Sequence, residues 1–189
     1  GDYAFVQHMI ASMAQGGNSR MAVVLPQGAL SRKNAEAKIR ESLLKEDLIE
    51  AVIGLAPTLF YGTQLAGCVM ILRRKKPAQR KNKVLIIDAQ SLFRKGRAQN
   101  FLDPEHGEQV VEWFQAFEDV EDRAKVVNLD EIKAEGWTLN ISRYVLPPIG
   151  EDIPPLPEAV AAFKDALTEA RAAEDHLRTV MTEGGWLND

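Results

Sequence analysis

The first hydrophobic positions of the chain recur with a helical period. Five apolar residues fall on one face of a helix predicted over residues 2–15: Phe5, Val6, Met9, Ile10 and Met13. Asp2 is a suitable N-cap, and Gly16-Gly17 a suitable stop. The chain therefore opens on an amphipathic helix.

The next apolar segment does not alternate. Residues 20–26, "RMAVVLP", are continuously apolar after Arg20, which predicts a strand buried on both faces, as in a parallel sheet. A loop with Gly28 follows, and then residues 34–47 read as a helix. Three residues form the predicted buried face of that helix: Ile39, Leu43 and Leu44.

Three further strands are predicted with no helix between them. They cover residues 48–55, 67–76 and 83–89. Helix and strand alternate before residue 48, which favours an α/β fold with a parallel sheet and right-handed crossovers. The uninterrupted strands after it predict an antiparallel strand near the edge of that sheet.

The acidic part of the chain carries another helix, over residues 103–117. Asp103 is the predicted cap and Pro104 occupies the first turn. Its predicted apolar face consists of Val110, Val111, Phe114 and Phe117. Residues 126–136 then predict a short strand and a helical turn.

A proline-rich segment divides the chain. Five prolines within residues 147–157 predict a stiff linker between a domain over residues 1–146 and a long amphipathic helix over residues 158–189. Seven positions of this tail are spaced by alternating three and four residues: Val160, Phe163, Leu167, Ala170, Glu174, Leu177 and Met181. One helix cannot bury such a face alone. We expect it to dock on another subunit, on another copy or back on its own chain.

Composition is ordinary for a globular protein of 189 residues, with 46% hydrophobic residues, 26% charged residues and a net charge of -4. The single cysteine, Cys68, lies within an apolar run and is expected to be a small buried side chain. No segment has the pattern of a membrane span or a signal peptide, which favours a cytoplasmic location. The start without methionine suggests a piece of a longer chain.

Basic residues gather in "RRKKPAQRKNK", residues 73–83, which contains seven of them and no acid. One interpretation is contact with nucleic-acid phosphates, made by Arg73, Arg74, Lys75 and Lys76. The alternative is a solvated tip between two strands. The acidic stretch over residues 103–135 argues against nucleic acid at that surface.

Sequence motifs for catalysis are absent. His8, His106 and His176 are far apart and lack metal-ligand spacing, so no metal site is expected. No P-loop, Gly-x-Gly-x-x-Gly or Gly-x-Ser-x-Gly occurs. On motifs alone, this chain has no visible catalytic centre.

The loop "APTLFYGTQLAG", residues 56–67, is the exception. Loops leaving the carboxyl ends of strands line the ligand crevice of α/β sheets. Phe60 and Tyr61 could stack there on a base, and Gly62 permits a close approach. The alternative is that Phe60 packs under the loop and Tyr61 covers a turn.

Several stretches in fixed order resemble the modification (M) subunit of type I restriction-modification systems. They are "VVLPQGALSRKNAEAKIRESLLKEDLIEAVIGL", "LFYGT", "CVMILRRKK", "VLIIDAQSLFRKGRAQNFL" and "LNISRYV", preceded by "DYAFVQHMI". The resemblance runs from about residue 3 to residue 146. Leu55-Ala56-Pro57 and Gln64 depart from the family's usual pattern around the loop.

The resemblance implies an N6-adenine DNA methyltransferase that uses S-adenosylmethionine. The fold it implies is the C-terminal half of a Rossmann-like methyltransferase sheet with an antiparallel strand, followed by the helical tail. Four residues would bind the flipped base: Phe60, Tyr61, Gly62 and Thr63. Phe5 would lie near the cofactor, and Pro26 and Gly28 would line the crevice.

The family's Gly-rich cofactor loop and its Asn/Asp-Pro-Pro-aromatic motif do not occur in residues 1–189. We therefore expect a fragment that is inactive alone, with no catalytic residue of its own and no metal requirement. Expected partners are DNA, the specificity and restriction subunits, and a second copy through the exposed sheet edge. Two alternatives stay open: a non-enzymatic assembly module, or a related methyltransferase acting on RNA or protein.

Overall fold

The computed structural model describes residues 1–17, 19–146 and 154–186. The chain divides into two compact units, residues 1–147 and 148–189. Most of the predicted linker, residues 147–153, lies outside the described residues, as do residues 187–189.

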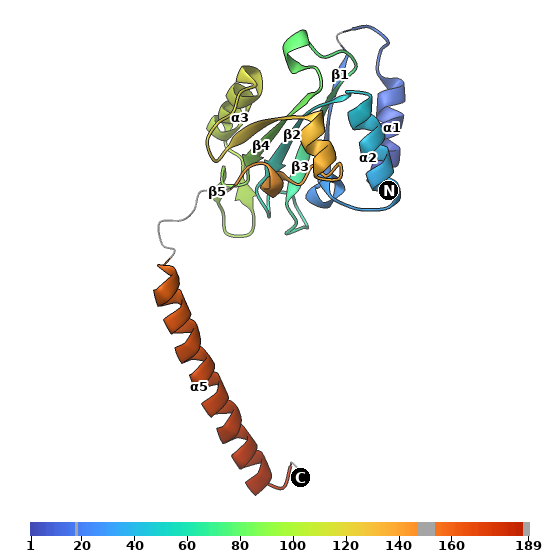
Figure 1. Ribbon diagram of the computed structural model, residues 1–189. Helices are drawn as coiled ribbons and strands as arrows, with labels where there is room; N and C mark the ends of the chain where they lie inside the picture. The colour runs from blue at the N-terminus through green and yellow to red at the C-terminus, as the bar shows by residue number, and fades with distance from the viewer. Residues whose placement is uncertain (18, 147–153, 187–189) are drawn as a thin grey trace. The chain divides into compact units, whose positions relative to one another are not determined.

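A five-stranded sheet forms the centre of the first unit (Figure 1). Its strands are β1 (Arg20–Pro26), β2 (Ile49–Leu55), β3 (Gly67–Arg73), β4 (Lys83–Ala89) and β7 (Ala124–Asn128). They lie in the order β1-β3-β2-β4-β7. A separate small hairpin consists of β5 (Arg94–Lys95) and β6 (Asn100–Phe101).

The sheet is mostly antiparallel, which corrects the parallel sheet expected from the sequence. β3 runs antiparallel to both of its neighbours, β1 and β2, and β7 runs antiparallel to β4. Only β2 and β4 pair in parallel within this sheet. The predicted antiparallel strand is therefore present as β3. β3 lies between β1 and β2 in the sheet. The crossover through α2 therefore connects β1 to β2, two strands that run in the same direction but are not neighbours.

Two apolar clusters lie on opposite faces of the sheet. In β4, Val84 and Ile86 belong to one cluster, whereas Leu85 and Ile87 belong to the other. This alternation follows from the two-residue period of a strand. Helices cover the first face: α1 (Asp2–Ser12), α2 (Ala35–Lys45) and α4 (Leu129–Ala134). α3 (Pro104–Ala116) covers the second face (Figure 1).

β1 is an edge strand and is not buried on both faces as predicted. Leu25 is buried, but Val24, which points to the opposite face, is 54% exposed. The reason is the position of α3, which packs on β4 and leaves the face of β1 uncovered. An uninterrupted apolar run does not specify which strands pair with a strand, or whether a helix packs on each of its faces.

The buried faces of α1 and α3 differ from the predicted ones. α1 buries Tyr3 and Val6, while Phe5 is exposed. The Tyr3 hydroxyl donates to the carbonyl of Ala29 at 3.0 Å, and burial raises the pKa of Tyr3 to about 12. In α3, Trp113 packs against the core, whereas the predicted Val111 is half exposed.

α2 buries a charged residue that hydrophobic periodicity did not indicate. Arg40 is 2% exposed and donates to three main-chain carbonyls. Its acceptors are Ala29 O at 3.1 Å, Arg32 O at 3.1 Å and Trp137 O at 2.8 Å. A buried guanidinium is tolerated when its donors are satisfied in this way. Arg40 thereby joins α2 to a segment almost a hundred residues further along the chain.

The predicted C-terminal helix is present as α5 (Leu156–Glu183), with 28 residues. Its apolar side chains are exposed within its own unit; for example, Phe163 is 65% and Leu177 is 58% exposed. No helix in the described part of the chain is both long enough and apolar enough to cross a membrane.

Candidate functional site

The loop between β2 and β3 borders two hollows on the surface. The first has a volume of about 330 Å³ and is lined by Thr58, Phe60, Tyr61, Gly62, Thr63, Gln64, Ala98 and Gln99. The second has a volume of about 210 Å³ and is lined almost wholly by apolar atoms of Val24, Leu25, Pro26, Phe60, Thr63, Leu65, Ala66 and Gly67. The Phe60 side chain is shared by both hollows.

Sheet topology brings the loop beside the end of β1. β1 and β2 are both antiparallel to β3, so their carboxyl ends lie at the same edge of the sheet. Pro26 pairs with Gly67, and the Gln27 amide donates to the Ala66 carbonyl at 3.1 Å. Two loops that are distant in sequence thus meet at this edge, which is where ligands bind in α/β sheets.

The two aromatic rings of the loop differ in exposure. Tyr61 is 96% exposed, whereas Phe60 is 36% exposed because one edge of its ring lies against Gly67. Gly62 adopts a left-handed φ of 77°, a conformation that favours glycine. The Thr63 hydroxyl accepts a hydrogen bond from the Leu65 amide at 3.1 Å, which closes the turn. Phe60 is therefore both packed and accessible, and Tyr61 has no packing role within the described residues.

The β5–β6 hairpin forms the opposite wall of the first hollow through Ala98 and Gln99. It is fastened to the loop by Asn100, whose amide donates to Thr58 O at 2.8 Å. The Asn100 side-chain amide also donates to Pro57 O at 2.8 Å. Sequence reasoning did not place these residues in the site, because nothing local indicates that a segment some forty residues away returns to the loop.

Not all of the predicted crevice residues meet there. Pro26 lines the second hollow, but Gly28 does not, and the Arg32 side chain is its nearest neighbour. Phe5, predicted to lie near the cofactor, is 73% exposed and lines neither hollow. One exposed ring cannot hold a charged cofactor such as S-adenosylmethionine, so the described residues do not fit a complete site for it.

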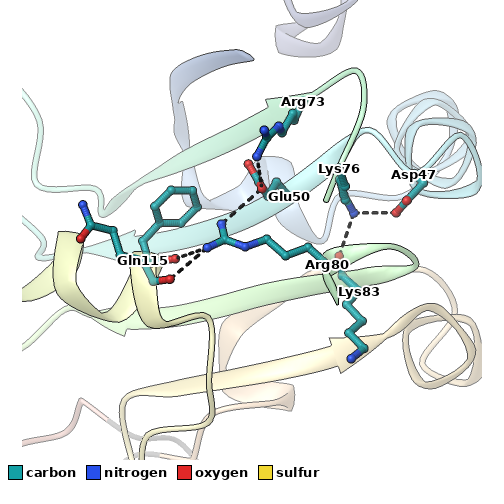
Figure 2. A network of polar contacts seen from close by, with 8 residues as sticks. Asp47, Glu50, Arg73, Lys76, Arg80, Lys83 and Gln115 are labelled. Carbon is teal, nitrogen blue, oxygen red and sulfur yellow. Dashed lines mark hydrogen bonds and ion pairs between the residues drawn. The ribbon is translucent and has the colours of Figure 1, made fainter. Parts of the chain in front are cut away.

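The basic segment over residues 73–83 joins β3 to β4, and part of it is folded into the protein (Figure 2). Glu50 is fully buried, and its Oε1 accepts from Arg73 and from Arg80, each at 3.3 Å. Arg80 also donates to Gln115 O at 3.0 Å, and its guanidinium lies 4.4 Å from the ring centre of Phe117. Arg80 thus joins β2 to the end of α3.

Two further cations of this segment are held internally. Arg74 donates to Ile10 O at 2.7 Å. The Lys76 ammonium is buried and contacts Asp47 Oδ1 at 2.6 Å and Lys83 O at 2.7 Å (Figure 2). Burial lowers the pKa of Lys76, and the contact with Asp47 opposes this shift.

Among the four residues predicted to contact DNA phosphates, only Lys75 has an exposed side chain. Arg73, Arg74 and Lys76 instead use their donors inside the fold. For these three, the arrangement favours a structural role, which a count of charges along the sequence cannot distinguish from a surface role.

The described residues form no metal site, and the one cysteine is buried. No group of three or more His, Cys, Asp or Glu side chains within them could hold a metal ion. Cys68 is buried, as expected, and burial raises the pKa of its thiol to about 12. A thiol of this kind is not a reactive nucleophile at neutral pH. What the site offers is aromatic surface and hydrogen-bonding backbone.

Comparison with known proteins gives one consistent result. Residues 1–152 match the family described as N-6 DNA methylase. The methylase subunit of the type I restriction enzyme MjaVII from Methanocaldococcus jannaschii is 37% identical over 179 residues, which covers 93% of this chain and 30% of that protein. The chain thus spans about a third or less of the curated relatives it matches.

Solved structures agree with this match. The methyltransferase subunit of a type I restriction-modification system from Streptococcus thermophilus is 39% identical, with a TM-score of 0.71, over 76% of this chain and 30% of that one. A chain from a study of complex assembly in a type I restriction-modification system has a TM-score of 0.61 at 18% identity. It covers 96% of this chain and 39% of that one, and supports the fold alone.

Proposed function

Because the chain belongs to the N-6 DNA methylase family, we propose that it forms part of the modification subunit of a type I restriction-modification system. The whole enzyme would transfer a methyl group to the N6 amine of adenine within a DNA recognition site. S-adenosylmethionine would supply that methyl group as an electrophile.

The observation that carries this proposal is the aromatic loop at the carboxyl edge of the sheet. Phe60 and Tyr61 border a hollow of about 330 Å³ that opens to the surface. An enzyme that modifies a base must take it out of the duplex, which costs a few kcal/mol. Stacking on an aromatic ring offsets part of that cost, at about 1–3 kcal/mol per base.

The two rings would act differently on the extruded base. Phe60 is braced against Gly67 and would present a fixed face. Tyr61 is almost fully exposed and would close over the base, displacing water from it. Gly62 and Thr63 shape the turn that carries both rings. These residues bind and orient the base, and none of them is positioned to move a proton.

The remaining chemistry would belong to residues outside this sequence. Residues 1–189 contain neither a Gly-rich cofactor loop nor an Asn/Asp-Pro-Pro-aromatic motif. We infer that these 189 residues alone transfer no methyl group. Phe5 remains a candidate contact for the cofactor, since its ring is exposed on α1.

The second unit would serve assembly. α5 presents apolar side chains that nothing in its own unit covers, including Val160, Leu167 and Leu177. A 28-residue amphipathic helix of this kind gains stability by packing on another helix. We assign this face to contact with the specificity subunit, which would choose the DNA sequence.

The test is methyl transfer by the assembled complex. The full-length subunit, purified with its specificity subunit, should transfer labelled methyl groups to adenine in duplex DNA containing the recognition site. DNA in which N6-methyladenine replaces the target adenine is the matched control substrate. Label found on cytosine, on RNA or on protein would refute the proposal. Tight S-adenosylmethionine binding by residues 1–189 alone in a calorimetric titration would refute the narrower inference that the cofactor site lies outside these residues.

A further inference from the structure

The β5–β6 hairpin carries cations that the fold does not use. Lys95 and Arg97 are both exposed, and within the described residues neither side chain forms a hydrogen bond or an ion pair. The hairpin lies against the aromatic loop through the two hydrogen bonds of Asn100 and supplies one wall of the 330 Å³ hollow. Free positive charge therefore borders the candidate base pocket.

The hairpin is held in a defined shape, which a merely solvated tip does not require. Arg94 Nε donates to Asp103 Oδ2 at 2.7 Å and its Nη2 donates to Oδ1 at 3.1 Å, a bidentate pair. The same guanidinium lies 4.6 Å from the ring centre of Phe101. A side chain on Gly96 would collide with that ring and with the carbonyl of Gln99. These contacts fix the direction in which the hairpin turns.

The segment over residues 73–83 also keeps three exposed lysines, Lys75, Lys81 and Lys83, but none of its residues lines the hollow beside the aromatic loop. In that segment, Arg73, Arg74, Lys76 and Arg80 donate to acceptors inside the protein. In the hairpin, Arg94 alone is used internally, and the charges of Lys95 and Arg97 stay available. A cation can bind a phosphate only if its donors are not already hydrogen-bonded to an acceptor inside the protein.

We propose that Lys95 and Arg97 bind the DNA phosphates next to the base held by Phe60 and Tyr61. This inference rests on the proposed function and deepens it. An extruded base stays attached to its own phosphates, so the backbone must pass within a few ångströms of the pocket rim. Cations on that rim hold the strand in register without reading its sequence.

The experiment measures DNA binding by the full subunit assembled with its specificity subunit, as a function of salt. The test variant is Lys95→Gln/Arg97→Gln. The matched control is Lys81→Gln/Lys83→Gln, which removes the same charge from exposed positions of the other basic segment. Lys95→Arg/Arg97→Lys keeps the charge and should behave as the wild type. Thermal melting verifies that every variant is folded.

The expected result is a loss of about 0.9 in the slope of log K against log[salt] for each phosphate contact, so about 2 for the test variant. The loss should be equal on specific and non-specific duplexes, with little change in the control. An unchanged slope in the test variant, with active wild type, would overturn the inference and leave the proposed function standing. Absence of methyl transfer and of DNA binding by the wild type would overturn both. If the variant is folded but does not co-purify with the specificity subunit, the hairpin binds a protein partner and the inference is wrong.

Discussion

The ring of Phe60 occupies the space that a side chain on Gly67 would need. A β-carbon on Gly67 would lie 2.7 Å from Cε2 of Phe60, which is closer than such atoms approach. Gly67 begins β3 and Phe60 belongs to the loop before it, so the strand itself positions the ring. The contact explains how a loop residue keeps one fixed orientation beside an open hollow.

Replacing Gly67 with Ala should displace the Phe60 ring and lower methyl transfer by the assembled enzyme. The stability cost should be that of overpacking, about 1–3 kcal/mol. Gly16→Ala is the control, because nothing lies within 4 Å of its added carbon. Rates of methyl transfer and urea unfolding are measured on both. Equal activity in the two variants would show that the ring's position is unimportant.

Replacing Tyr61 with Ala should separate function from stability. Tyr61 is 96% exposed, so the free energy of unfolding should change by less than about 0.5 kcal/mol. Loss of stacking should lower catalytic efficiency on DNA roughly 5- to 150-fold, from about 1–3 kcal/mol per base. Tyr61→Phe, which keeps the ring, should remain near wild type. A Tyr61→Ala enzyme with normal efficiency would remove this residue from the base pocket.

Replacing Glu50 with Ala should strongly destabilise the first unit. Glu50 is fully buried between Arg73 and Arg80, and its loss leaves two guanidinium groups without their carboxylate. Breaking a buried pair in this way costs about 3–5 kcal/mol. Glu41→Ala, which removes a partly exposed pair with Lys45, should cost less than about 1 kcal/mol. Similar unfolding free energies for the two variants would contradict the buried network.

The pH dependence of stability should report on Lys76. Burial lowers the pKa of folded Lys76 below the unfolded value of about 10.4. Between these two values the unfolded chain binds more protons, so the stability of the wild type rises with pH across that window. Lys76→Met lacks this contribution. The stability difference, wild type minus variant, should therefore increase toward about pH 10.4.

Urea unfolding at a series of pH values measures this difference. Lys75→Met, at the exposed neighbouring position, is the control and should give a constant difference. A constant difference for Lys76→Met as well would mean that the ammonium is not buried in solution.

Replacing Leu167 with Asp should prevent α5 from binding the specificity subunit. Leu167 belongs to the apolar face of α5, and a carboxylate there would have to be desolvated on docking. Ala172→Asp places the same charge on another face of the same helix and should leave assembly intact. Co-purification of the two subunits is the measurement. Assembly of both variants would place the docking surface elsewhere.

The sequence predicted where the helices and strands lie along the chain better than it predicted which of them pack together. β2, β3 and β4 coincide with apolar runs, because a strand buried by helices on both faces needs little else to be specified. The exposure of β1 could not be predicted, because it depends on where α3 packs. Buried charges such as Arg40 and Glu50 were also missed, since their partners lie far away in sequence.

The candidate site shows the same limit. Two adjacent aromatic residues, Phe60 and Tyr61, indicated the loop, and the position of Pro26 after a strand indicated part of its wall. Ala98 and Gln99 became visible only through the hydrogen bonds of Asn100 to Thr58 and Pro57. The sequence pointed to the basic segment over residues 73–83, but it does not show that Arg73, Arg74 and Lys76 are already bonded inside the protein.

The burial of Arg40 has a consequence for the order of folding during synthesis. Two of its carbonyl acceptors, on Ala29 and Arg32, are made early, but the third, on Trp137, emerges from the ribosome about a hundred residues later. At about 5–20 residues per second, this is a delay of several seconds. During that time the Arg40 guanidinium on α2 lacks its third acceptor and cannot be fully buried. The packing of α2 against the segment around Trp137 is therefore incomplete. The nascent chain can bury Arg40 fully only once Trp137 has left the ribosomal tunnel.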